Sequence, residues 1–402
     1  MAADLLVYNG RIITETECLA SGYVHIRNGT IASVGEKWEG VRTERRIDAE
    51  GLIVSPGFID MHTHGIGDTD FMSSDTSGMV EGLRAYARFG VTRIVGTTLS
   101  NTMERILEQA GRIREAMNDG EFGPMLLGAH IEGPWLAPRC RGGHAIEYLR
   151  VPEKEDVERL LGEAGDVIRT VTFSPELPGA ERLAERLALH SIVGAMGHTE
   201  ASFEQAERMI RAGARHVTHM YDGTLGYREN PDEPLVMMPG METAVLMDDA
   251  VSIELIGCPV HVPPPFFRFI NKVKPAPKKV LVTDSLVGTG KPEGTVLTYR
   301  DGRKVYVAQG VLRMMDDDPA VNGNLTGSAV TMNVALKRLR EYAGIRLHEA
   351  VRWGSLHPAV TLGIDRETGS IRAGKSADLV IMDEDFTIKR TMLRGRTIYE
   401  AK

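Results

Sequence analysis

Short runs of apolar residues recur along the middle of the chain, and longer stretches with apolar positions at helical spacing separate them. Each run is apolar at nearly every position, as strands buried on both faces are. Eight such runs can be counted: FIDMHTH, VTRIVGTT, MLLGAHIEG, IRTVTFSP, SIVGAMGH, HVTHMY, VSIELIG and KKVLVTDS. The amphipathic stretches include residues 76–89, 101–118, 153–164, 179–189 and 200–213. This alternation predicts a (β/α)₈ TIM barrel over residues 56–357, with its active site at the carboxyl ends of the strands.

The two ends of the chain follow a different pattern. Residues 1–55 contain short β-branched segments separated by turn pairs such as Asn9-Gly10, and residues 358–402 have the same character. Because chain termini often lie close together, we expect both ends to form one small, discontinuous β-sandwich domain. Hairpin-like segments at 291–324 interrupt the strand–helix alternation and predict an insertion after the last barrel strand.

Composition narrows the class of protein. The 402 residues suit one barrel of about 250 residues with a smaller domain beside it. The net charge of −8 and the lack of long runs of like charge argue against a nucleic-acid binder. Three scattered cysteines are too few for a disulfide framework. With no apolar signal segment and no run of 18 apolar residues, we expect a soluble cytoplasmic protein that contacts neither nucleic acid nor membrane.

Four of the 12 histidines stand at the ends of predicted strands. His62 and His64 close the first strand, and their spacing of two places both imidazoles on one face. His198 and His219 close two later strands. Taken singly, each is more often an ordinary polar residue at a loop entry. Together at the mouth of one barrel they indicate a metal site.

Two carboxylates complete the set. Glu132 ends the third apolar run, where a carboxylate is costly unless it is paired, and Asp284 ends the last run. Imidazole and carboxylate ligands suit Zn, Fe, Co, Ni or Mn, and the residues alone do not choose among these metals. His216 lies three residues before His219, hence on the opposite face of the same strand, and we expect it to pack outside the barrel.

The order of these motifs, HxH, HIEGP, GHT, THMY and TDS, resembles the amidohydrolase superfamily and, within it, the N-acetylglucosamine-6-phosphate deacetylases. Similar stretches are SPGFIDMHTHG, HIEGPWLAPRCRGGH, MGHTEASFEQA, LTGSAVTMNVAL, LHPAVTLGI and GSIRAGKSADLVIMD, so the likeness covers about residues 5–400. It implies a metal-dependent hydrolase that cleaves the N-acetyl amide of an amino sugar, built as a barrel with a β-sandwich.

The resemblance also implies metal ligands. Glu132, His198 and His219 match the residues that hold the principal metal of the family. His62 and His64 match the ligands of a second metal that some members bind, with the glutamate bridging. We therefore expect one or two divalent ions per subunit, and zinc first among them.

Three further residues match catalytic or sugar-binding positions of the family. Asp284 matches the general base that takes a proton from water and returns it to the leaving amine. His144 matches a histidine that contacts the substrate carbonyl, where a donor stabilises the developing oxyanion. His261 matches a histidine that contacts the sugar, although the stretch before it reads Gly257-Cys258-Pro259 where the family has aspartate-glycine.

The segment HMYDGTLGYRENPDEPLVMMPG departs from the family at the expected phosphate site. Arg228 matches an arginine that grips the phosphate, often across a dimer interface, and an arginine fork suits that ligand. Asp222, followed by Gly223, replaces an asparagine, and its carboxylate would repel a phosphate dianion by roughly 1–4 kcal/mol. About ten extra residues also separate Arg228 from Pro239-Gly240.

These observations favour a homodimeric deacetylase acting on N-acetylglucosamine 6-phosphate. An unphosphorylated N-acetyl sugar, or another N-acyl or cyclic amide, is the alternative substrate, because one fold serves many reactions. The identity of the sugar epimer stays open. A non-catalytic relative is disfavoured, because such proteins typically lose metal ligands and this chain retains all six metal and base groups.

Overall fold

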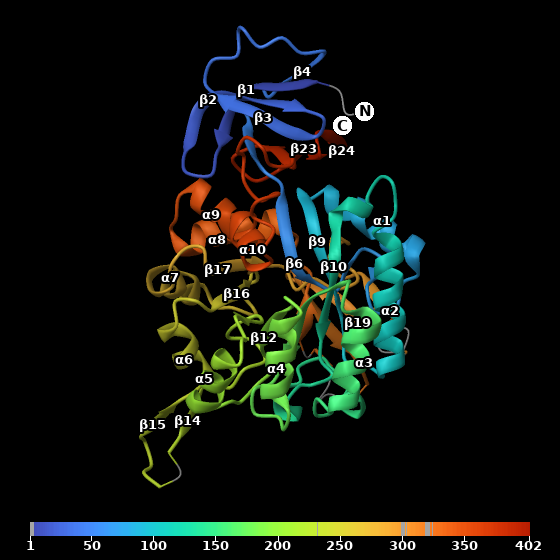
Figure 1. Cartoon of the computed structure of the whole chain (residues 1–402), viewed down its shortest axis with the longest axis vertical. Helices are drawn as coiled ribbons and strands as arrows, with labels where there is room; N and C mark the ends of the chain where they lie inside the picture. Colours follow the sequence, from blue (N-terminus) through green and yellow to red (C-terminus); the bar gives the residue numbers. More distant parts are fainter. Residues whose placement is uncertain (1–3, 231, 299–301, 303, 318–321, 324) are drawn as a thin grey trace.

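The computed structural model describes residues 4–230, 232–298, 302, 304–317, 322–323 and 325–402. Its centre is a barrel of eight parallel strands (Figure 1). In barrel order they are β6 (Phe58–Thr63), β9 (Val91–Thr98), β10 (Leu126–Glu132), β11 (Ile168–Phe173), β12 (Val193–Met196), β13 (His216–Val217), β16 (Ser252–Ile256) and β17 (Lys279–Val282). The first and last strands meet where the Asp284 N–H donates to the His62 carbonyl at 3.0 Å. All eight predicted strands are confirmed, and so is the TIM barrel.

Helices surround the barrel and bury one face each. α2, for example, buries Met103, Ile106 and Ile113 at intervals of three and seven residues. The helices are α1 (Thr76–Ala87), α2 (Met103–Ala116), α3 (Lys154–Ala164), α4 (Ala180–Leu189), α5 (Phe203–Arg211), α6 (Met241–Met247), α7 (Pro264–Val273), α8 (Met332–Ala343), α9 (Leu347–Trp353) and α10 (Leu356–Thr361). Short 3₁₀ turns lie at Gly123–Met125, Pro138–Cys140 and Ile146–Tyr148. Within the described residues, no helix has the length and apolar character needed to cross a bilayer.

The two chain ends form one sheet at an end of the barrel (Figure 1). Its strands are β1 (Leu5–Ile13), β2 (Cys18–Arg27), β3 (Thr30–Gly35), β4 (Arg45–Asp48), β5 (Ile53–Pro56), β22 (Leu379–Met382), β23 (Ile388–Leu393) and β24 (Arg396–Glu400). The sheet branches at β1, which pairs with β2 on one side and with both β4 and β5 on the other. Alternate residues face two cores: Ile53 and Val380 pack with the barrel, Val54 and Ile381 within the sheet domain.

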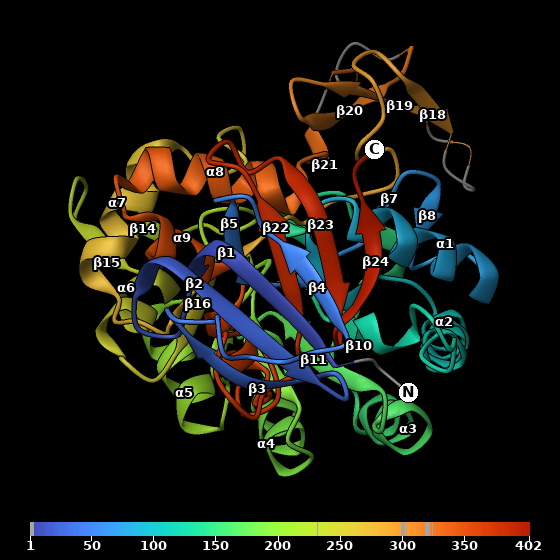
Figure 2. The ribbon, with the colours of Figure 1, turned by 90° about the horizontal axis from the view of Figure 1, so that it is seen from above.

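A small antiparallel sheet follows the last barrel strand and stands apart from the terminal sheet (Figure 2). It consists of β18 (Val296–Thr298), β19 (Lys304–Ala308), β20 (Val311–Met315) and β21 (Leu325–Ser328). Leu286, in the loop after β17, packs in its core with Val305 and Leu312. The sheet is therefore tied to the strand end that carries Asp284.

Two hairpins complete the fold. β7 (Gly65–Ile66) and β8 (Thr69–Asp70) fold back directly after β6. β14 (Tyr227–Glu229) and β15 (Met237–Pro239) form a hairpin that projects from the body of the molecule (Figure 1). This hairpin belongs to the segment in which the sequence departs from the deacetylase pattern.

Candidate metal and catalytic site

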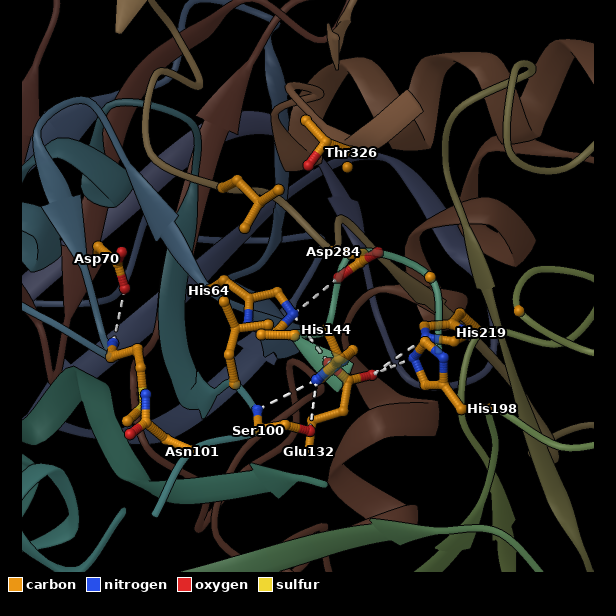
Figure 3. Close-up of a pocket in the computed structure, with 18 of the residues that line it drawn as sticks. His64, Asp70, Ser100, Asn101, Glu132, His144, His198, His219, Asp284 and Thr326 are labelled. Carbon is orange, nitrogen blue, oxygen red and sulfur yellow. Dashed lines mark hydrogen bonds and ion pairs between the residues drawn. The ribbon is translucent and has the colours of Figure 1, made fainter. Parts of the chain in front are cut away.

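The predicted site residues converge on one cavity of about 300 Å³ at the carboxyl ends of the barrel strands (Figure 3). Those that line it are His64, Glu132, His144, His198, His219, Asp222, Gly223, His261 and Asp284. His62 is fully buried and contacts this group from within the barrel. One cavity therefore joins residues from six separate segments of the chain.

The backbone turns sharply at three of these residues. His198, His219 and Asp284 each lie two residues beyond the end of a barrel strand. Their φ angles are 49°, 24° and 48°, in the left-handed region that residues with a Cβ seldom adopt. Such conformations cost about 1–3 kcal/mol each and persist where the surrounding structure enforces them. They turn the three side chains off their strands and toward the cavity.

The carboxylate of Glu132, which is 1% exposed, is the centre of the cluster. Five imidazoles surround it: its Oε1 lies 3.5 Å from His62 Nε2, 3.3 Å from His198 Nε2 and 3.1 Å from His219 Nε2, and its Oε2 lies 3.1 Å from His64 Nε2 and 3.3 Å from His144 Nε2. Two sets of three residues are close enough to hold a metal ion, namely His62-His64-Glu132 and Glu132-His198-His219. Glu132 belongs to both.

The other ring nitrogen of three of these histidines already has a partner. The Nδ1–H groups of His62, His198 and His219 donate to Glu254 Oε1 at 2.6 Å, to the Cys140 carbonyl at 2.7 Å and to the Asp222 carbonyl at 3.1 Å. In the neutral ring the proton is therefore on Nδ1, which leaves Nε2, facing the carboxylates, as the atom that can bind a metal. The Nε2 of His62 is buried without a hydrogen-bond partner. These donor atoms fit a divalent metal.

Asp284 lies beside the cluster, with Oδ1 3.3 Å from His62 Nε2 and 3.2 Å from His64 Nε2. Burial alone would raise the pKa of Asp284, but the neighbouring imidazoles outweigh it and lower the pKa to about 2. Burial likewise opposes the charged form of His64, yet Asp284 and Glu132 raise its pKa to about 9. The buried carboxylates are therefore stabilised by a nearby positive charge, which protons on the imidazoles or a metal ion can supply.

His144 reaches the cluster from the loop after β10. Its Nδ1 accepts from the backbone N–H of Ser100 at 3.1 Å and lies 2.8 Å from the Ser100 hydroxyl. The ring proton therefore sits on Nε2, which faces Glu132. Burial, reinforced by the nearby His198 and His64, lowers the pKa of His144 to about 4. His144 is thus a neutral N–H donor aimed into the cavity.

The predicted sugar-binding residues lie against the same cavity. Asp222 is half-buried, and His261 is 6% exposed. Gly223 has a φ of 58°, and a Cβ there would lie 2.9 Å from His198 Nδ1, so only glycine fits. The side chain of Arg228 lies outside the described part of the structure. Its backbone pairs with Met238 across the projecting hairpin.

The prediction for His216 is wrong. Its Nε2 donates to Glu254 Oε2 at 3.0 Å, and Glu254 in turn holds His62, so His216 points into the barrel interior. The strand β13 ends at Val217, and the alternation counted back from His219 does not extend across that break.

Sequence reasoning did not single out several residues of the site. Glu254 is one, and its signal was a carboxylate in the middle of the apolar run VSIELIG, which has to be paired if it is buried. The residues at the far end of the cavity were also not predicted. Asp70 and Asn101 line it on the side opposite His198 and His219 (Figure 3), and Leu325, Thr326 and Gly327 bring the inserted sheet to its edge.

Comparisons with known proteins agree with this geometry. The family model described as "Amidohydrolase family" matches residues 271–398. The N-acetylglucosamine-6-phosphate deacetylase of Bacillus subtilis is 30% identical over 406 residues, covering 100% of this chain and 99% of the relative. An N-acetylgalactosamine-6-phosphate deacetylase of Escherichia coli O157:H7 is also 30% identical, covering 96% of this chain and 97% of the relative.

Solved structures give the same picture. The N-acetylglucosamine-6-phosphate deacetylase of Mycobacterium smegmatis, as an aspartate-to-alanine variant in complex with N-acetylglucosamine 6-phosphate, superposes with a TM-score of 0.86 at 28% identity, covering 98% of this chain and 99% of that one. The N-acetylglucosamine-6-phosphate deacetylase of Thermotoga maritima superposes with a TM-score of 0.84 at 29% identity, covering 98% of this chain and 100% of that one. With near-complete coverage of its relatives and a matching site, this chain belongs to the N-acetylglucosamine-6-phosphate deacetylase family of metal-dependent amidohydrolases.

Proposed function

We propose that this enzyme hydrolyses the N-acetyl amide of N-acetylglucosamine 6-phosphate to acetate and the free amino sugar phosphate. The observation that carries the proposal is the buried group of imidazoles around Glu132, with Asp284 beside it at the floor of a substrate-sized cavity. The relatives named above, and the sugar phosphate bound in the structure from Mycobacterium smegmatis, support this choice of substrate.

Glu132, His198 and His219 would hold one divalent metal, and His62 and His64 would hold a second with Glu132 shared. Zinc is the metal we propose, because nitrogen-rich sites with a carboxylate suit it. A divalent metal bound here lowers the pKa of water and polarises the amide carbonyl.

The residues around the reacting amide then have distinct tasks. Asp284 accepts a proton from the attacking water while the water oxygen adds to the amide carbon. The same carboxyl group returns the proton to the amide nitrogen, the C–N bond breaks, and acetate and the amine leave. The Nε2–H of His144 donates to the amide oxygen as negative charge develops there, a contact typically worth about 10²–10³-fold in rate.

We place the sugar beside the imidazoles of His198 and His219, against Asp222, Gly223 and His261. Arg228 then binds the phosphate, and it comes from the second subunit of a homodimer. The projecting hairpin supports that assembly, because Leu235 is 95% exposed and Met237 is 69% exposed, and an isolated two-stranded hairpin is marginal in water. Light scattering of the purified enzyme tests the dimer.

A second candidate substrate is the unphosphorylated N-acetyl sugar. The Asp222 carboxylate on the sugar side of the cavity favours it, since that group accepts hydrogen bonds from hydroxyls and repels a phosphate. The epimer is a separate question, because one relative is named for N-acetylgalactosamine 6-phosphate. We also propose a cytoplasmic location, consistent with the free thiols of Cys18, Cys140 and Cys258.

Acetate release from a panel of N-acetyl sugars, after reconstitution with zinc, tests the proposal. The panel pairs N-acetylglucosamine and N-acetylgalactosamine with their 6-phosphates, and adds an N-acetylamino acid and a cyclic amide. We expect the highest kcat/KM on N-acetylglucosamine 6-phosphate. Faster turnover of the free sugar would favour the second candidate, and turnover confined to the amino acid or the cyclic amide would contradict both.

A further inference from the structure

Glu254 lies on β16 beneath the cluster and is 1% exposed. Its carboxylate accepts three hydrogen bonds. Oε1 accepts from His62 Nδ1 at 2.6 Å and from the backbone N–H of His219 at 2.9 Å, and Oε2 accepts from His216 Nε2 at 3.0 Å. Within the described residues, no lysine or arginine is paired with this carboxylate. Two of the residues that stabilise its buried charge are candidate metal ligands.

The contact with His62 determines which ring nitrogen faces the cluster. An ionised carboxylate can only accept, so the proton of His62 sits on Nδ1. The lone pair on Nε2 is thereby directed toward Glu132 Oε1 and Asp284 Oδ1, at 3.5 and 3.3 Å. A carboxylate behind a ligand imidazole also increases the basicity of the ligand nitrogen.

The contact with His219 acts through the backbone. The φ of His219 is 24°, an unfavourable value for a residue with a Cβ. Glu254 holds this turn from two sides: its Oε1 accepts the N–H of His219, and its own carbonyl accepts the N–H of Met220 at 2.9 Å. The turn points the His219 imidazole at Glu132, 3.1 Å away.

We propose that Glu254 is a positioning residue for both metal positions at once. One oxygen orients a ligand from the His62-His64-Glu132 set and a ligand from the Glu132-His198-His219 set. Glu254 does not line the cavity and acts only through these two residues. The inference rests on the metal centre of the proposed function and is independent of which sugar is cleaved.

The test is the metal affinity of Glu254→Gln and Glu254→Met, measured by chelator competition with zinc and by the visible spectrum of the cobalt-substituted protein. Glutamine keeps a carbonyl oxygen for His62 and His219 but loses the charge, so we expect affinity about tenfold weaker. Methionine removes the acceptor, so we expect metal affinity about 100-fold weaker. Both substitutions should weaken binding at every metal position that is filled in the wild-type enzyme. Both should also alter the cobalt spectrum.

Ser252→Ala is the matched control. It removes the hydroxyl that contacts His216 Nδ1 at 2.8 Å and leaves the three contacts of Glu254 in place, so metal affinity should stay at the wild-type value. Wild-type affinity in Glu254→Gln, weakening at only one of two filled positions, or an equal loss in Ser252→Ala would overturn the proposal. If Glu254→Met does not fold, the metal affinity of Glu254→Gln alone tests the proposal. If the wild-type enzyme binds metal but does not deacetylate the sugars, that result would count against the proposed function alone.

Discussion

The part of the cavity wall that carries the imidazoles (the imidazole wall) differs from the adjoining part that carries Asp222 (the sugar wall) in how firmly the fold fixes it. Every imidazole around Glu132 is at most 6% exposed and belongs to a barrel strand or to a loop that begins at one. His62, His198 and His219 are each held by a hydrogen bond on the nitrogen that faces away from the cluster. Their geometry is therefore determined before any ligand arrives.

The proposed sugar side includes the loop after β13. Asp222 is only half-buried, and the segment that follows it leaves the body of the molecule as β14 and β15, where Leu235 and Met237 face solvent. Loops on a rigid scaffold are where related enzymes vary their specificity. The difference suggests that the amide-cleaving chemistry and the choice of sugar can change independently in this protein.

Replacing the shared carboxylate gives the largest expected effect and tests the imidazole wall directly. Glu132→Ala removes the one group that belongs to both candidate metal sets. We expect bound metal and turnover to be lost together, with kcat reduced more than about 10⁴-fold, because water then keeps its high pKa. Elemental analysis after dialysis and an acetate assay measure the two quantities.

A matched control for that experiment is His357→Asn. His357 is also buried, but it donates to the Lys279 carbonyl at 2.6 Å and has no contact with Glu132. This variant should retain metal. Full metal occupancy in Glu132→Ala would contradict the assignment of Glu132 as a ligand.

Asp284→Asn separates proton transfer from metal binding on the same wall. The amide cannot accept the proton of the attacking water, so we expect kcat to fall by about 10²–10⁴-fold. Metal content should persist, because neither candidate metal set includes Asp284. Steady-state kinetics together with metal analysis measure this. A kcat within tenfold of the wild type would show that another group is the base.

The barrel and the grouping of the candidate ligand side chains could be predicted from the sequence, because both follow from local rules. A buried parallel strand has to be apolar throughout, and an ionisable residue at its end has few structural reasons to be there. His198, His219 and Asp284 each lie two residues past such a strand, so their convergence follows from the topology.

The misplaced and missed residues depend on contacts that lie far apart in sequence. Whether His216 points inward is decided by Glu254, 38 residues later. Glu254 in turn meets His62 across 192 residues, and no local pattern encodes that pairing. The contribution of the inserted sheet to the cavity depends on how Leu286 anchors it. Periodicity predicts elements, whereas these contacts arise only when the barrel closes.

The smallest expected effect concerns the sugar wall. Asp222→Asn should raise kcat/KM for N-acetylglucosamine 6-phosphate relative to the free sugar. Removing a repulsion of roughly 1–4 kcal/mol corresponds to about fivefold or more in that ratio, with the lower end favoured because Asp222 is partly exposed to water. Parallel steady-state kinetics on the two sugars measure the ratio.

Asp70→Asn makes the same change of charge at the opposite end of the cavity and serves as the matched control (Figure 3). If the ratio rises only in Asp222→Asn, the carboxylate acts locally on the phosphate, and the sugar wall sets specificity as the comparison of the two walls implies. An equal rise in both variants would mean that the phosphate responds to the total charge of the cavity. An unchanged or lower ratio in Asp222→Asn would place the phosphate away from Asp222, and the sugar would then have to lie in a different orientation against the imidazoles.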